Sequence, residues 1–160
     1  MTDKTKKYDK LSSNMEDYLE TVIVLKQKDG VVRAKDISEL MNVTKASVSC
    51  ALKTLSRKGF VLHEKYGHVD FTPKGEELAN KIKKRHDMLT KFLKNILGLD
   101  NKLSEKDACK IEHALSTKTS KRLAKFVEFV QSSETPEWLK GFNFYIKTGK
   151  RSECKYKRKK

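Results

Sequence analysis

The chain has 160 residues and a formal net charge of +15 at pH 7, with 36 Lys and Arg against 21 Asp and Glu. This length fits one domain or two small ones, and it suffices to bury a core without disulfides. Three cysteines without a CxxC pair exclude a disulfide framework and a zinc ribbon, and no apolar run is long enough to span a membrane. We expect a reduced, cytoplasmic protein whose positive charge favours nucleic acid as its partner.

The first predicted helix lies in SSNMEDYLETVIVLKQKDG, residues 12–30. Ser13 or Asn14 suits its N-cap, and Gly30 follows its end. Its apolar residues recur at helical spacing and predict a buried stripe: Met15, Tyr18, Leu19, Val22 and Ile23. Asp17 and Glu20 lie off that stripe, three residues apart, on a second face of the helix.

Two short helices joined by a turn at Asn42 and Val43 are expected next. The first covers residues 34–41, with Ile37, Leu40 and Met41 facing inward. The second follows Thr44, which can cap it, and its inward stripe consists of Val48, Leu52 and Leu55. Because small polar and basic residues line the outer face of the second helix, the pair is typical of a helix-turn-helix.

The stretch FVLHEKYGHVDFTPKG, residues 60–75, predicts two strands around a turn at Tyr66 and Gly67. A hairpin directly after a recognition helix is a wing, so residues 1–73 are expected to form a winged helix-turn-helix DNA-binding domain. Short side chains at the start of the recognition helix suit base edges, and the longer cations suit phosphates. The predicted DNA contacts are Lys35, Thr44, Lys45, Ser47, Ser49, Lys53, Arg57 and Lys65.

The remainder predicts an all-helical domain over residues 74–145 and a basic tail over residues 146–160. A long helix runs from Pro73 to about Leu97, and a second helix is capped by Ser104. The amphipathic stretch at residues 116–132 and the helix opening at Pro136 follow. Their predicted inward residues are Leu123, Phe126, Val127 and Val130, then Trp138, Leu139 and Phe142. The last fourteen residues hold eight Lys or Arg against one Glu, which fits a nucleic-acid arm or a solvated end.

The stretch DACKIEHAL places Cys109, Glu112 and His113 at positions i, i+3 and i+4, on one face of a helix. A thiolate, a carboxylate and an imidazole are all metal-binding groups. On this segment alone, a buried Cys, a surface Glu and a solvated His explain the residues equally well. A metal site requires other segments to converge with it, namely His86 of the long helix and the two carboxylates of the first helix.

The segments NMEDYLETV, the winged helix, FTPKGEELANKIKKRHDML, LGLD and DACKIEHAL occur in the order found in the diphtheria-toxin-repressor family. The chain resembles these metal-dependent regulators of iron or manganese uptake over about residues 13–131. The resemblance implies a homodimer that binds operator DNA when its metal is bound, with residues 74–145 as the metal-binding and dimerisation domain. It also implies a metal-ligand set, which consists of Asp17, Glu20, His86, Cys109, Glu112 and His113.

Within that family the chain mixes two patterns. Asp17 and Glu20 resemble the manganese-regulator branch, whereas Cys109 resembles the iron-regulator branch. Oxygen ligands suit manganese and a thiolate favours iron, cobalt or zinc, so the expected cofactor is Mn(II) or Fe(II), with Zn(II), Co(II) or Ni(II) as substitutes. Glu105 takes the place of an ancillary ligand and predicts a weaker second site with His86. Too few residues follow Ser132 for the SH3-like domain that many relatives carry.

Three other hypotheses remain open from the sequence. The winged helix could belong to a metal-independent DNA-binding regulator, or it could serve as a protein-interaction scaffold. A metalloenzyme with Glu112 as general base is disfavoured by the lack of an HExxH motif and of a second acid–base pair. We therefore expect a mainly α-helical protein that is not an enzyme.

Overall fold

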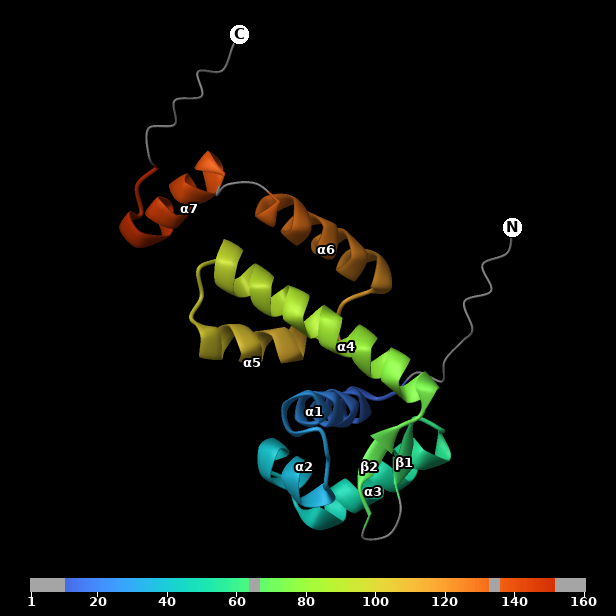
Figure 1. The fold of residues 1–160 in the computed structure, drawn as a ribbon. Coiled ribbons are helices and arrows are strands. Elements are labelled where there is room, and N and C mark those ends of the chain that lie inside the picture. The colour runs from blue at the N-terminus through green and yellow to red at the C-terminus, as the bar shows by residue number, and fades with distance from the viewer. Residues whose placement is uncertain (1–10, 64–66, 133–135, 152–160) are drawn as a thin grey trace, which may run out of the picture. The chain divides into compact units, whose positions relative to one another are not determined.

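The computed structural model describes residues 11–63, 67–132 and 136–151, and most of these residues are helical (Figure 1). The chain forms two compact units, residues 1–84 and 85–160, which are described separately below. The helix α4 (Pro73–Lys91) begins in the first unit and ends in the second. The expected fold class, a winged helix-turn-helix followed by helices, is confirmed. No helix in the described part is long and apolar enough to cross a membrane.

In the described part of the first unit, three helices and a hairpin precede α4. Helix α1 (Ser13–Asp29) is followed by the helix-turn-helix pair α2 (Ala34–Met41) and α3 (Lys45–Arg57). Strands β1 (Val61–His63) and β2 (Val69–Phe71) pair antiparallel with Val61 opposite Phe71. An isolated bridge from Val32 to Val69 adds the segment after α1 to the hairpin. This order of elements is that of a winged helix.

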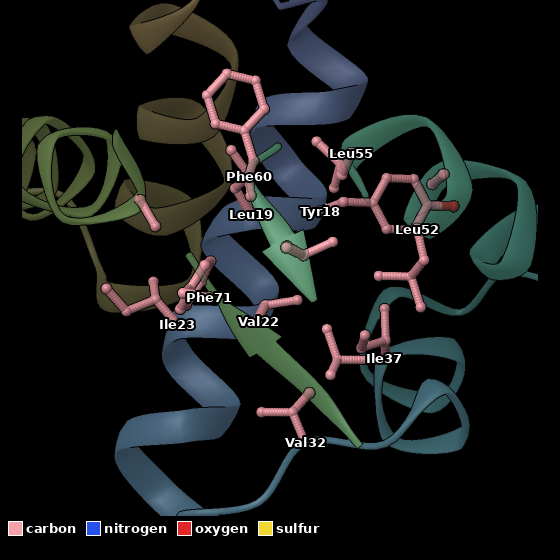
Figure 2. Close-up of a cluster of buried hydrophobic side chains, with 14 of the residues drawn as sticks. Tyr18, Leu19, Val22, Ile23, Val32, Ile37, Leu52, Leu55, Phe60 and Phe71 are labelled. Carbon is pink, nitrogen blue, oxygen red and sulfur yellow. The ribbon is translucent and has the colours of Figure 1, made fainter. Parts of the chain in front are cut away.

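The apolar stripes predicted for α1 and α3 meet in one core (Figure 2). Leu19 and Val22 of α1 and Leu52 and Leu55 of α3 are fully buried. Burying each such side chain stabilises the fold by about 1.5–3 kcal/mol. Leu40, which was expected to face inward, is 56% exposed, whereas Ile37 is buried and Ala34 and Met41 of α2 pack against the core.

The caps of the first unit agree with the sequence at two positions and differ at one. Thr44 caps α3, since its hydroxyl accepts a hydrogen bond from the Ser47 N–H at 3.2 Å. Gly30 ends α1 with φ of 73°, a backbone conformation that favours glycine. The N-cap of α1 is Ser12 rather than Ser13 or Asn14, and the Ser12 carbonyl accepts the first helical hydrogen bonds.

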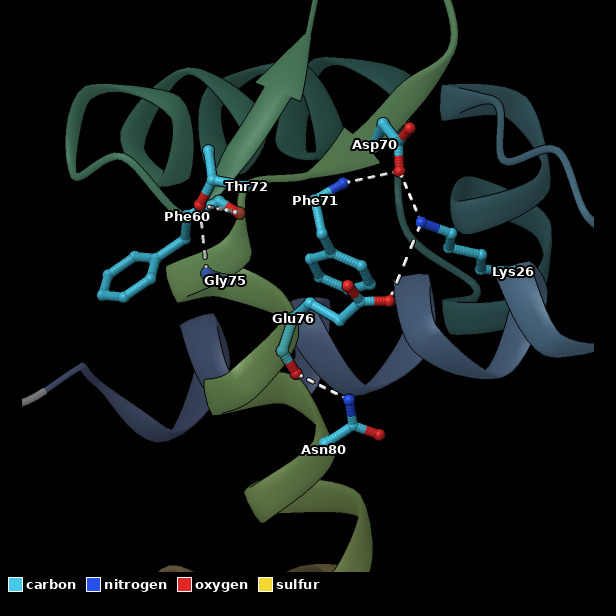
Figure 3. A network of polar contacts seen from close by, with 8 residues as sticks. All are labelled: Lys26, Phe60, Asp70, Phe71, Thr72, Gly75, Glu76 and Asn80. Atoms are coloured by element: carbon cyan, nitrogen blue, oxygen red, sulfur yellow. Dashed lines mark hydrogen bonds and ion pairs between the residues drawn. The ribbon is translucent and has the colours of Figure 1, made fainter.

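A polar network joins α1, the wing and the start of α4 (Figure 3). Lys26 of α1 reaches Asp70 of β2 at 2.6 Å and Glu76 of α4 at 4.0 Å. The Thr72 hydroxyl donates to the Gly59 carbonyl at 2.7 Å and accepts from the Gly75 N–H at 3.0 Å, which caps α4. These contacts fix α1 to the wing within the first unit.

The second unit continues α4 into a π-helical turn, η1 (Phe92–Ile96), followed by α5 (Asn101–Glu112), α6 (Thr117–Gln131) and α7 (Glu137–Thr148). The prediction that Ser104 caps α5 was wrong. The helix begins one turn earlier, where the Asp100 carboxylate accepts a hydrogen bond from the Leu103 N–H at 3.0 Å. Ser104 lies inside the helix and is buried.

Two apolar clusters form the core of this unit. Leu89, Leu93 and Ala108 anchor one cluster, and Ile96, Val127, Val130 and Leu139 anchor the other. Phe126 and Trp138, expected to face inward, are 40% and 46% exposed. Their rings instead lie beside each other with centroids 6.4 Å apart, and the Phe126 ring also meets the Phe92 ring edge-on at 6.4 Å.

Candidate metal centre

The second unit brings together four of the predicted metal ligands. His86 lies on α4, Cys109 and Glu112 lie on α5, and His113 is the C-cap of α5. Their spacing of three and four residues places Cys109, Glu112 and His113 on one helical face, as the sequence predicted. The decisive feature is the carboxylate of Glu112, because both histidines approach it.

Glu112 is a fully buried carboxylate. Its Oε2 lies 3.4 Å from Nδ1 of His86, and its Oε1 lies 3.4 Å from Nε2 of His113. Neither oxygen accepts a hydrogen bond from any residue that the structure describes. Both distances exceed the 2.7–3.2 Å usual for a nitrogen–oxygen hydrogen bond, so the imidazoles face the carboxylate without bonding it well. A buried carboxylate without hydrogen bonds is costly unless a cation compensates its charge.

These residues fit a divalent transition metal. Carboxylate oxygen and imidazole nitrogen are ligands for such ions, and a cation between them would satisfy the charge of Glu112. Cys109, one helical turn before His113, is half-buried and forms no disulfide within the described residues, and a thiolate is a softer ligand than a carboxylate.

The remaining predicted ligands differ in their surroundings. Asp17 and Glu20 lie on α1 of the first unit. Both are half-buried, although their side chains are charged. Glu105 is exposed on α5 and accepts a hydrogen bond from the Asn101 amide at 3.0 Å. Within the described ranges Glu105 does not join His86 in any cluster of three possible metal-binding side chains, and the ancillary site stays a prediction.

The predicted DNA contacts are mostly exposed on the first unit. Lys45, Ser49, Lys53 and Arg57 are exposed along α3, and the hydroxyls of Thr44 and Ser47 lie 2.9 Å apart at its start. Lys35 is exposed on α2 and pairs with Glu39 at 3.5 Å. Lys65 lies outside the described residues. Ser56, which the sequence analysis omitted, is exposed one turn after Lys53, and that spacing was the signal that could have found it.

Two family descriptions match the two halves of the chain. Residues 10–69 match the N-terminal DNA binding domain of the iron dependent repressor, and residues 72–137 match its metal binding and dimerisation domain. The chain belongs to the iron-dependent repressor family. This family consists of transcriptional regulators, and the chain carries both of its domains. The family resemblance seen in the sequence is thereby confirmed, and so are metal-dependent regulation, homodimerisation and DNA as the partner.

Relatives within the family share a third of their residues with this chain. An HTH-type transcriptional regulator of Methanocaldococcus jannaschii is 37% identical over 119 residues, which are 74% of this chain and 95% of that protein. The regulator MntR of Lysinibacillus sphaericus is 34% identical over 127 residues, 79% of this chain and 89% of that protein.

Solved structures agree in fold. The manganese regulator SloR has a TM-score of 0.65 and 31% identity over 74% of this chain, and IdeR of T. acidophilum has a TM-score of 0.63 and 25% identity over 71%. This chain covers 55% and 53% of the length of those two chains, respectively.

Proposed function

We propose that this protein is a repressor that binds operator DNA as a homodimer when Mn(II) or Fe(II) is bound, and that it thereby controls uptake of that metal. The observation that carries the proposal is the buried carboxylate of Glu112, which lies between two imidazoles and lacks hydrogen bonds in the described part of the chain. Relatives named as manganese regulators, such as SloR, support the choice of metal.

The proposed ligand set takes residues from both units of the chain. His86, Cys109, Glu112 and His113 would supply the second unit's ligands, and Asp17 and Glu20 would supply those of the first. The bound ion contributes positive charge and directed coordination, and Zn(II), Co(II) or Ni(II) can substitute for it. The oxygen ligands favour Mn(II), whereas the Cys109 thiolate favours Fe(II) or a softer ion.

The charges of these residues suggest how the switch works. If Asp17, Glu20 and Glu112 formed one site, their carboxylates would repel one another without a cation, and this would oppose assembly of the site. A bound cation would compensate the negative charge and would allow α1 to contribute to the site. The ion needs to favour that arrangement by only about 1–3 kcal/mol to act as a regulatory switch.

Within the first unit, movement of α1 must carry the helix-turn-helix with it. Leu19 and Val22 of α1 are fully buried in the core shared with α3, and Lys26 ties α1 to the wing and to α4. In a homodimer, fixing α1 therefore fixes the separation of the two recognition helices. DNA half-sites accept one such separation, which is one helical turn or a multiple of it.

This function requires no catalysis and places the protein in the cytoplasm, where its operator DNA lies. Glu112 is proposed as a ligand rather than as a general base, and the protein is proposed not to be an enzyme.

The test is anaerobic binding to the DNA fragment upstream of the protein's own gene, followed by fluorescence anisotropy at fixed salt in chelator, Mn(II), Fe(II) and Zn(II). We expect wild-type protein to bind at least about tenfold more tightly with Mn(II) or Fe(II) than in chelator, which corresponds to about 1.4 kcal/mol of coupling. Glu112→Gln keeps the side chain's shape but removes its charge, and it should lose most of this difference.

A matched control is Glu128→Gln, the same change at an exposed position on α6. It should keep the metal response, because Glu128 does not belong to the proposed ligand set. Equal binding of wild-type protein in chelator and in metal would contradict the proposal and leave a metal-independent winged-helix regulator.

A further inference from the structure

In the described part of the chain, most of the excess positive charge lies outside the unit that carries the predicted DNA contacts. The described residues of the second unit hold fourteen Lys and Arg against seven Asp and Glu, whereas those of the first unit hold twelve against nine. The winged helix therefore accounts for little of the charge that made nucleic acid the expected partner. A polyanion that binds this protein meets more net positive charge on the second unit than on the first.

One helix of the second unit gathers four of these cations on a single face. They occur in α6 (Figure 1) at positions i, i+3, i+4 and i+7, so their side chains line one side of the helix. All four are exposed, and we call them the α6 stripe: Lys118, Lys121, Arg122 and Lys125. The other side of α6 packs into the core through Val127 and Val130, and this packing directs the stripe toward solvent.

The α6 stripe has no counter-charge among the residues that the structure describes. None of its side chains forms an ion pair there, although Lys81, Lys110 and Lys140 each pair with a carboxylate three or four residues away on their own helices. Glu128 is the one acidic residue of α6, and it lies three residues after Lys125 without pairing with it. The stripe therefore presents uncompensated positive charge to solvent.

The stability of the helix does not explain this arrangement. Like charges at spacings of three and four residues repel each other and weaken a helix. Lys118 also lies in the first turn of α6, where the helix dipole disfavours a cation, and that turn contains no acidic residue. A bound polyanion would offset both costs, because its charge compensates that of the four cations.

We propose that the α6 stripe is a second DNA-binding surface, which contacts the phosphate backbone of double-stranded DNA. The seven residue steps from Lys118 to Lys125 span about 10 Å along the helix. One strand of B-DNA carries one phosphate per about 3.4 Å, so the stripe matches about three consecutive phosphates. Backbone contacts of this kind position DNA without reading its sequence.

This surface adds to the interface expected from the sequence. DNA is the polyanion that this family binds, and every predicted DNA contact lies on the first unit, whereas α6 belongs to the second. None of the proposed metal ligands lies on α6 either. DNA contact at the stripe therefore does not depend on the metal switch.

An anionic membrane also offers negative charge, but α6 fits it less well. Helices that bind a membrane surface insert an apolar face beside their cationic one. The apolar side of α6 is instead buried in the core of the second unit, through Val127 and Val130. The rings of Phe126 and Phe129 are exposed near the end of the stripe, and they make an anionic vesicle the necessary comparison.

The first test measures the affinity of the full chain in Mn(II) for a duplex of arbitrary sequence as the salt concentration is raised. Each phosphate contact contributes about 0.9 to the slope of log affinity against log salt. We expect Lys118→Gln/Lys121→Gln/Lys125→Gln to make that slope shallower by about 2–3 per protomer. The variant should unfold at the wild-type temperature or above it, because it removes repulsion between like charges.

A matched control removes the same charge from three other helices of the second unit. It changes one exposed lysine on each of α4, α5 and α7: Lys91→Gln/Lys102→Gln/Lys147→Gln. The two triple variants have the same net charge, so a general loss of attraction affects both equally. The control should keep the wild-type slope, because its lysines do not form one continuous surface.

The second test uses the wild-type protein and locates the contact directly. Limited acetylation with acetic anhydride, followed by mass spectrometry, reports which lysines a bound duplex shields. DNA should slow the acetylation of Lys118, Lys121 and Lys125 severalfold. The rates at Lys102 and Lys147 should stay unchanged.

The outcomes separate this surface from a membrane site and from the metal switch. Equal slopes for the stripe variant and its control, or unshielded α6 lysines in the DNA complex, would show that the stripe does not bind DNA, although the metal response can remain. Binding to phosphatidylglycerol vesicles that the stripe variant loses, at an unchanged DNA slope, would assign the stripe to a membrane and overturn the proposal. A shallower slope for the stripe variant, with equal binding of wild-type protein in chelator and in Mn(II), would support the surface and contradict the metal switch.

Discussion

The carboxylate of Asp70 is held by two donors at the base of the wing. Its Oδ1 accepts hydrogen bonds from the Lys26 ammonium at 2.6 Å and from the Phe71 N–H at 2.8 Å. The Lys26 hydrogen bond, and then that of Phe71, hold the pKa of Asp70 below its ordinary value of 3.8. The same bond to Asp70 raises the pKa of Lys26. These two residues therefore couple the stability of the first unit to pH.

At the residue scale we predict that Asp70→Asn lowers the free energy of unfolding at pH 7 by less than about 1 kcal/mol, because the Asp70 side chain is 61% exposed and solvent screens the pair. A carboxylate with a lowered folded-state pKa contributes stability above its unfolded pKa, and that contribution is lost as pH falls through the folded value. The difference between wild type and variant should thus shrink as pH falls below 3.8.

Urea unfolding at pH 7 and at several values below pH 4 measures this difference. Asp29→Asn, the same change at the exposed end of α1, serves as the control. A difference for Asp70→Asn that stays constant down to pH 2 would show that the ion pair does not stabilise the fold.

At the scale of elements, the wing and α4 approach each other closely at Gly75. A Cβ atom built on Gly75 would lie 1.7 Å from the Phe60 carbonyl oxygen, and that oxygen belongs to backbone that cannot move as a side chain can. Thr72 fixes the same junction, because its hydroxyl donates a hydrogen bond to the Gly59 carbonyl and accepts one from the Gly75 N–H, the second of which Figure 3 shows. The residue at position 75 therefore decides whether α4 can start where it does.

We predict that Gly75→Ala lowers the free energy of unfolding by about 3 kcal/mol or more, because the clash forces backbone to shift. The control is Gly30→Ala, where nothing lies within 4 Å but φ is +73°, so only the conformational strain of about 1 kcal/mol applies. Urea unfolding compares the two variants. A smaller loss of unfolding free energy for Gly75→Ala than for Gly30→Ala would contradict the close approach of Gly75 to the Phe60 backbone.

At the scale of the whole molecule, the proposed ligands come from both units, so metal binding and folding are linked. An ion that binds the folded state alone stabilises it by about 2.7 kcal/mol at a free concentration one hundred times its Kd. Without a compensating cation, the buried charge of Glu112 lowers the stability of the folded protein.

We predict that Mn(II) raises the thermal unfolding midpoint of the wild-type protein by several degrees over chelator, about 4–8 °C for each kcal/mol in a domain of 60–100 residues. Differential scanning calorimetry on Glu112→Gln should show a much smaller rise. That variant should also be no less stable than wild type in chelator, since it removes an uncompensated buried charge. A rise of equal size in both proteins would show that the ion binds at a site that does not include Glu112.

Local patterns in the sequence predicted many of the helices, their ends and the family of this protein. Apolar spacing predicted the stripes of α1 and α3, Thr44 and Gly30 predicted two helix ends, and the order of motifs predicted the family. These features could be predicted because capping, periodicity and short motifs depend on residues within a turn or two of one another. For the same reason the sequence grouped Cys109, Glu112 and His113 on one helical face.

Only the tertiary structure decided which of those side chains are buried and what they meet. In the structure, Glu112 is buried between His86 and His113. Leu40, Phe126 and Trp138 are exposed, and the N-cap of α5 is Asp100 rather than Ser104. The tertiary structure also brought His63 beside the end of α3. Burial depends on how distant segments pack, and spacing along the chain records only which side chains share a face.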